Sequence, residues 1–115
     1  MSMVKRERFN IARHEEILNF IKQFQDLGAT NCFSNGMCYW FAVILKERFE
    51  DGLIVYNQID NHFAVLLYDT FRVYDITGDV SDKCEWEDFE FLSYADELLY
   101  NRLLRDCVYK LPFRE

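Results

Sequence analysis

The chain has 115 residues, half of them apolar and 17% aromatic, and a formal net charge of −7. This length suits one domain with a real core, spanning residues 1–115, and the composition argues against disorder. An acidic chain whose only basic cluster is Lys5, Arg6 and Arg8 is a poor binder of nucleic acid or anionic membranes.

Export and metal signals are absent from the sequence. No apolar run approaches the length of a membrane span, and residues 1–11 are too polar for a signal-peptide core. We therefore expect a cytoplasmic protein in which Cys32, Cys38, Cys84 and Cys107 are reduced. The cysteines form no C-x-x-C pair and the two histidines lie far apart, so we expect no metal site and no cofactor.

The first predicted element is an amphipathic helix over residues 11–26, where apolar residues recur at three- and four-residue steps. Gly28 is its predicted C-terminal cap, and His14 is expected to face solvent. A polar loop follows over residues 29–35 and contributes Asn31. Loops that lead into a buried helix often form one wall of a site.

The second predicted helix covers residues 36–50 and is apolar nearly all round in its first turns, which indicates burial in the middle of the domain. Gly52 is suited to cap its C-terminus. Cys38 lies in the first turn, where the unpaired N–H groups and the helix dipole favour a thiolate. Free cysteines are also common core residues, so position alone leaves both roles open.

Three stretches rich in β-branched and aromatic residues are predicted strands: residues 53–56, 62–68 and 71–76. With Asp69 and Thr70 as a two-residue loop, the last two strands form a hairpin in which Leu66 faces Val73. His62 and Asp75 then share one face as diagonal neighbours within side-chain reach. The rest of that face is apolar and is expected to pack on the central helix: Ala64, Leu66 and Val73.

The remaining chain is read as an acidic loop over residues 77–88, a second amphipathic helix over residues 91–107 and a short extended tail over residues 108–113. Trp86 and Phe89 are expected to be held against the core.

Cys38, His62 and Asp75 have the residue types and order that thiol catalysis requires. A cysteine nucleophile needs a base that titrates near neutral pH, and the base needs a carboxylate or an amide to fix its tautomer. The sequence therefore predicts a candidate triad of Cys38 as nucleophile, His62 as base and Asp75 as its orienting partner.

Two segments resemble the transglutaminase-like branch of the papain-like cysteine-enzyme superfamily. Residues 36–45, which begin Gly-Met-Cys-Tyr-Trp-Phe-Ala and end at Leu45, are similar to the family's G-x-C-x-x-F-A-x-x-x-L helix start. Residues 62–65 and 73–78 are similar to its histidine strand and its aspartate strand. The resemblance covers about residues 35–78, less than half of the chain, and it implies an α+β fold in which a small antiparallel sheet packs on the cysteine-bearing helix.

The resemblance also implies a function and shows one departure. Papain-type enzymes place a glutamine shortly before the cysteine, where this chain has Cys32, so Asn31 and the Cys38 backbone N–H are the expected oxyanion donors. The implied activity is that of a cysteine-dependent hydrolase or acyl transferase on a peptide or protein amide substrate: a peptidase, an amidase, a glutamine deamidase or an enzyme that transfers the acyl group to an amine. The alternative is an inactive binding or inhibitor protein that keeps the fold, as proteins of viruses and mobile elements can.

Overall fold

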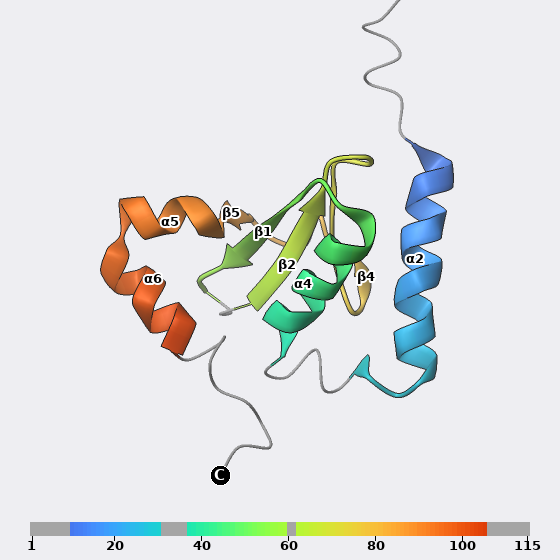
Figure 1. The fold of residues 1–115 in the computed structure, drawn as a ribbon, viewed down its shortest axis with the longest axis horizontal. Coiled ribbons are helices and arrows are strands. Elements are labelled where there is room, and N and C mark those ends of the chain that lie inside the picture. The colour runs from blue at the N-terminus through green and yellow to red at the C-terminus, as the bar shows by residue number, and fades with distance from the viewer. Residues whose placement is uncertain (1–9, 31–36, 60–61, 106–115) are drawn as a thin grey trace, which may run out of the picture.

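The structure, a computed structural model, describes residues 10–30, 37–59 and 62–105. Its helices and strands run in the order α2 (Ile11–Asp26), α4 (Cys38–Phe49), β1 (Gly52–Asn57), β2 (His62–Leu67), β3 (Arg72–Asp75), β4 (Gly78–Asp79), β5 (Glu87–Asp88), α5 (Phe89–Ala95) and α6 (Glu97–Leu103). The strands form one antiparallel sheet in the order β4-β3-β2-β1-β5, with α4 lying against it (Figure 1). The expected α+β fold with a small antiparallel sheet beside the cysteine-bearing helix is thus present.

Helix α4 is the buried centre of the fold, as its apolar sequence predicts. Its buried side chains join the main core cluster: Cys38, Phe41, Ala42, Leu45 and Phe49. The predicted cap at Gly52 is wrong, because the chain reverses at Glu50 and Asp51, which have φ of 56° and 41°. Gly52 instead begins β1, where an added Cβ would lie 2.9 Å from the Leu66 carbonyl oxygen. A glycine is needed there because β1 and β2 approach closely.

The β2–β3 hairpin has the predicted register, since Leu66 pairs with Val73. The predicted two-residue loop is wrong. Strand β2 ends at Leu67 and β3 begins at Arg72, so a four-residue turn joins them. Within this turn the Phe71 N–H donates to the Leu67 carbonyl oxygen at 2.7 Å. Because the loop grows symmetrically, no side chain changes face, and His62 and Asp75 remain on the same side.

The predicted packing of that face is wrong. Ala64 and Val73 belong to a second cluster with Val55 and Val80, beside Leu66 and Trp86, and no α4 residue takes part in it. Helix α4 covers the alternate face, whose large side chains complete the main cluster: Phe63, Val65, Leu67, Tyr74 and Ile76. Both faces of this hairpin are apolar, so the alternation of the sequence could not show which face receives the helix.

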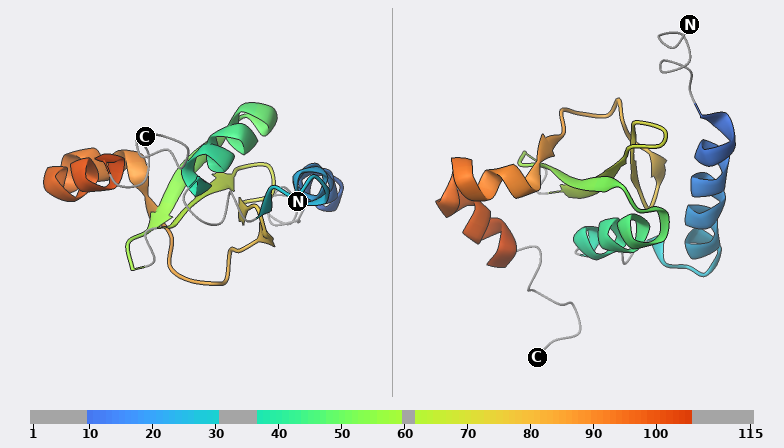
Figure 2. Two further views of the ribbon diagram at one scale, coloured as in Figure 1. Left: turned by 90° about the horizontal axis from the view of Figure 1, so that it is seen from below. Right: turned by 45° about the horizontal axis from the view of Figure 1, so that its top comes forward.

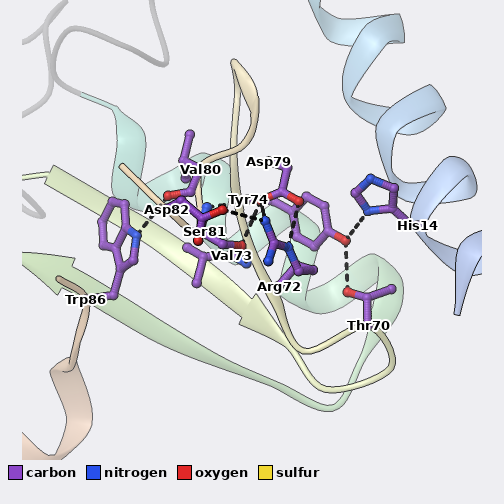
Figure 3. Close-up of polar contacts among 10 residues, drawn as sticks. All are labelled: His14, Thr70, Arg72, Val73, Tyr74, Asp79, Val80, Ser81, Asp82 and Trp86. Carbon is purple, nitrogen blue, oxygen red and sulfur yellow. Dashed lines mark hydrogen bonds and ion pairs between the residues drawn. The ribbon is translucent and has the colours of Figure 1, made fainter. Parts of the chain in front are cut away.

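The acidic stretch expected as a loop contains the two-residue strands β4 and β5 and is fixed to the sheet by side-chain contacts (Figure 3). Arg72 donates to both carboxylate oxygens of Asp79 at 2.8 and 3.3 Å. Asp79 also accepts from the Ser81 N–H and hydroxyl, and the Trp86 Nε1–H donates to the Val80 carbonyl oxygen at 3.0 Å. These contacts hold Trp86 on the sheet, as expected.

The single helix predicted over residues 91–107 is instead the pair α5 and α6. Asp88 accepts from the Phe91 N–H at 3.1 Å and caps α5, whereas Asp96 accepts from the Leu99 N–H at 3.1 Å and caps α6. Aspartate competes for backbone N–H groups and favours caps over helix interiors, so Asp96 divides the apolar repeat. Phe89 is buried, as expected, and the predicted tail lies outside the described residues.

Helix α2 has the predicted bounds, and Gly28 follows it with a φ of +81°. Its Ile17 and Ile21 are buried in the main cluster. The prediction that His14 faces solvent is wrong, because this half-buried ring places Nδ1 2.8 Å from the Tyr74 hydroxyl (Figure 3). Figure 2 shows α2 at one end of the molecule and α5 and α6 at the other.

Candidate active site

The ends of three elements meet at the candidate site. Cys38 is the first residue of α4, His62 is the first residue of β2 and Asp75 is the last residue of β3. Figure 1 shows the start of α4 beside the start of β2, and the Phe63 N–H donates to the Cys38 sulfur at 3.4 Å. The predicted strand alternation and helix start therefore bring these residues together, although α4 covers the opposite face of the hairpin.

The contact between His62 and Asp75 is short and almost enclosed. His62 Nε2 lies 2.7 Å from Asp75 Oδ2, and the two side chains are 24% and 9% exposed. The other carboxylate oxygen accepts from the Thr77 N–H at 2.7 Å and the Thr77 hydroxyl at 2.6 Å. Both oxygens of Asp75 are thus held by donors, which fixes the carboxylate toward the imidazole.

The electrostatics of the pair favour an imidazolium facing a carboxylate. The hydrogen bond to Asp75, with a second one to Cys38, outweighs burial and raises the pKa of His62 from 6.5 to about 9. Burial alone would raise the pKa of Asp75, but the hydrogen bonds from His62 and Thr77 lower it below its ordinary value. His62 is therefore positively charged and Asp75 negatively charged at neutral pH.

The Cys38 thiol completes this hydrogen-bonded chain. Since Asp75 occupies Nε2 of His62, Nδ1 is the ring nitrogen left for the bond to Cys38. Burial would raise the pKa of the thiol, but the hydrogen bond and charge of His62 and the N–H groups of Phe63 and Tyr39 together lower it. The arrangement favours a thiolate paired with an imidazolium.

Trp86 and Thr77 belong to the site although the sequence did not single them out for it. The Trp86 ring lies 6.0 Å from the His62 ring, measured between centroids, and is half-buried. Thr77 follows Asp75 by two residues, the spacing of an aspartate-centred turn, and this local pattern is the signal that could have identified it.

Access to the thiol is narrow, because Cys38 is 7% exposed. The more exposed edge of the site is the imidazole of His62. Asn31, the predicted oxyanion donor, lies outside the described residues, as does the rest of the 31–36 stretch. The structure thus brings together three of the four predicted site residues: Cys38, His62 and Asp75.

Residues 10–30, 37–59 and 62–105 contain neither a cluster of metal ligands nor a helix suited to a membrane. No three His, Cys, Asp or Glu side chains in these ranges gather closely enough to hold a metal ion. Nor does any helix in them combine the length and the apolar content needed to cross a membrane.

Fold and site together define an α+β protein in which a cysteine, a histidine and an aspartate are hydrogen-bonded in series at one end of the sheet. The sequence model of the family described as Phage YunG-like protein matches residues 17–106, which include all three residues. The match spans more than half of the chain, so the chain belongs to the Phage YunG-like protein family. No curated protein and no solved structure matches it.

Proposed function

We propose that this chain is a cysteine-dependent hydrolase or acyl transferase that acts on an amide or ester carbonyl. The observation that supports it best is the 2.7 Å contact from His62 Nε2 to Asp75, made by an imidazole that is also hydrogen-bonded to Cys38. A histidine that only filled a core would not need a carboxylate on one nitrogen and a thiol at a helix start on the other.

The first step uses the thiolate–imidazolium pair. The Cys38 thiolate attacks the carbonyl carbon, a C–S bond forms and the carbonyl oxygen becomes an oxyanion. As the oxyanion collapses, the C–N or C–O bond to the leaving group breaks, and His62 gives its proton to the departing amine or alcohol. An acyl thioester on Cys38 and a neutral imidazole remain.

The second step returns the enzyme to its starting state. His62 takes a proton from a water molecule or an amine, which attacks the thioester carbon. The C–S bond then breaks and restores the thiolate beside the imidazolium. Asp75 keeps its charge throughout and stabilises the imidazolium, a role suited to its lowered pKa.

The oxyanion needs hydrogen-bond donors aimed at it. The N–H of Cys38, as the first residue of α4, has no acceptor within the helix and points out of its N-terminus. Asn31 is the proposed second donor, in place of the glutamine of papain-type enzymes. The site and the short segments around it also support membership of the transglutaminase-like branch of the papain-like superfamily as part of this proposal.

A peptide or protein amide is the proposed substrate class. One triad can perform peptide hydrolysis, amide hydrolysis, glutamine deamidation and transfer of the acyl group to an amine. The proposed thiol chemistry requires a reduced Cys38, which suits action in the cytoplasm.

The deciding experiment is intact-protein mass spectrometry after incubation with a panel of aryl esters, thioesters and activated amides. We expect an added acyl mass on Cys38 that disappears in Cys38→Ala and forms far more slowly in His62→Ala. Cys84→Ala is the matched control, because Cys84 is the other cysteine among the described residues that forms no disulfide. This substitution should leave the adduct unchanged.

A second candidate function is binding without catalysis, and the 7% exposure of Cys38 favours it. If iodoacetamide alkylates Cys38 but no acyl donor in the panel does, the residue is reachable and yet does not perform acyl transfer. That result would reject the hydrolase and favour a binding or inhibitor protein that keeps the fold.

A further inference from the structure

Helices α5 and α6 carry three large apolar side chains that the rest of the described chain leaves uncovered, and the surface that bears them is called the α5–α6 face. Phe91, Tyr94 and Leu98 are 62%, 87% and 84% exposed. The inner side of the same helices is anchored by the buried residues Phe89, Leu92 and Leu103, so this exposure does not reflect a loosely attached segment. In both views of Figure 2, α5 and α6 project at the end of the molecule away from α2.

A surface depression of about 400 Å³ adjoins this face, lined by Asp88, Glu90, Phe91, Ser93, Tyr94 and Tyr100. Its walls combine aromatic rings with carboxylates. Cations are attracted to both kinds of group, since a ring face carries negative potential and a carboxylate carries charge. The depression therefore has the chemistry to accept a lysine or arginine side chain.

The segment from β5 to the first turn of α6 is acidic. Residues 87–98 contain five acidic side chains and no basic one, a formal charge of −5. The next basic residue is Arg102, in the last turn of α6. Nucleic acid, an anionic membrane and a second copy joined through the same face would all meet like charge here.

We propose that the α5–α6 face, centred on Phe91, Tyr94 and Leu98, docks a basic amphipathic segment of a partner protein. The apolar side of the segment covers the exposed side chains, and a basic residue enters the depression beside Asp88 and Glu90. No residue of this face belongs to the Cys38–His62–Asp75 site. The proposal therefore does not depend on the proposed function.

Fluorescence anisotropy with a labelled synthetic peptide tests the proposal. The probe is a leucine–lysine peptide with the spacing of an amphipathic helix, and its counterpart has glutamate at every lysine. The full chain should bind the lysine peptide and not the glutamate peptide. Tyr94→Ala combined with Leu98→Ala should weaken binding by about tenfold or more, because exposed aromatic and aliphatic anchors carry much of the energy of such interfaces.

Matched controls distinguish binding at this face from nonspecific binding elsewhere on the surface. Leu27→Ala combined with Ile59→Ala removes two side chains that are 82% and 87% exposed elsewhere, and should leave affinity within about twofold. Glu90→Gln combined with Glu97→Gln should weaken binding and reduce its salt dependence. Glu15→Gln combined with Glu47→Gln makes the same change in net charge at exposed sites on α2 and α4. This pair should change neither the affinity nor its salt dependence.

Four results would overturn the proposal. They are absence of binding to the lysine peptide, equal losses in the two pairs of apolar variants, self-association that Tyr94→Ala with Leu98→Ala abolishes, and binding of the face to zwitterionic lipid vesicles. Self-association would assign the face to a second copy of the chain, and vesicle binding would assign it to a membrane. Binding of the lysine peptide should persist in Cys38→Ala, which keeps this result separate from the test of catalysis.

Discussion

Cys38 and His62 have pKa shifts in opposite directions, and together these shifts define the pH range of the thiolate–imidazolium pair. The pKa of Cys38 is lowered, while that of His62 is raised to about 9. The ion pair therefore exists between the lowered pKa of the thiol and about pH 9. Asp75 stabilises the His62 imidazolium, and the backbone N–H groups of Phe63 and Tyr39 stabilise the Cys38 thiolate.

The first prediction is selective alkylation. Thiolates react with iodoacetamide and thiols do not, so at mildly acid pH a limiting dose should label Cys38 before Cys84, as peptide mapping would measure. His62→Ala should abolish the selectivity, Asp75→Asn should weaken it less, and His14→Ala should leave it unchanged. A Cys38 that reacts no faster than Cys84 would make it a core thiol.

The second prediction links the pair to stability. Because the folded pKa of His62 is about 9 and its ordinary value is 6.5, its stabilising effect is complete below pH 6.5 and is lost as the pH rises through 9. The Asp75 contribution is present above its ordinary pKa of 3.8 and is lost as the pH falls through its lowered value. The loss of unfolding free energy in His62→Gln should thus be greatest between pH 3.8 and 6.5.

Urea denaturation at pH of about 5.5 and about 9.5 would measure this difference. In an Asp75→Asn background, the His62→Gln substitution should lose much of its pH dependence, because the main cause of the raised pKa has been removed. A His62→Gln effect of equal size at both pH values would contradict an imidazolium in the folded protein.

Among single residues, the proximity of Cys38, His62 and Asp75 could be predicted, whereas the residues that hold them in place could not. Cys38 was marked by its helix start, and His62 and Asp75 by a hairpin register that tolerates a symmetric change in loop length. Trp86 is held near His62 by its hydrogen bond to Val80, in a segment that Asp79 and Ser81 fix to β3. No periodicity in the sequence predicts such contacts.

At the scale of elements, prediction succeeded where one periodicity ran uninterrupted. Helix α2 has its predicted bounds, and the three longer strands lie where β-branched residues cluster. It failed where a single polar residue or a two-residue pairing decided the structure. Asp96 divides an apolar repeat that otherwise fits one helix, and β4 and β5 are too short to leave a pattern.

The third prediction concerns the start of β1. Gly52→Ala should destabilise the protein by about 1–3 kcal/mol, because its Cβ would meet the Leu66 carbonyl oxygen and the Leu67 side chain, each at 2.9 Å. Gly28→Ala is the comparison, since nothing lies within 4 Å of its Cβ and only its φ of +81° is unfavourable. It should cost about 1 kcal/mol. Equal losses in urea denaturation would show that β1 can move away from β2.

At the scale of the molecule, α2 supports the hairpin that presents His62 and Asp75. Arg13 Nε lies 2.9 Å from Asp69 in the hairpin turn, and Gln25 donates to the Ile76 carbonyl oxygen at 2.7 Å, directly after Asp75. Between them, His14 meets the Tyr74 hydroxyl, which also lies 2.8 Å from the Thr70 hydroxyl. The first helix and the strands that carry His62 and Asp75 are therefore expected to lose their structure together.

The fourth prediction tests this coupling with Tyr74→Phe. Tyr74 is 0% exposed, so removing its hydroxyl deprives His14 and the buried Thr70 of a partner without opening a path to water. The cost should be about 1–3 kcal/mol, as for other buried polar groups that lose a bond. Hydrogen exchange should rise in α2 and in β3 more than in α4. Tyr68→Phe removes a hydroxyl from a side chain that is 51% exposed and should change stability by less than about 0.5 kcal/mol. Faster exchange confined to α2, with β3 unchanged, would show that the hairpin stabilises the helix but the helix does not stabilise the hairpin.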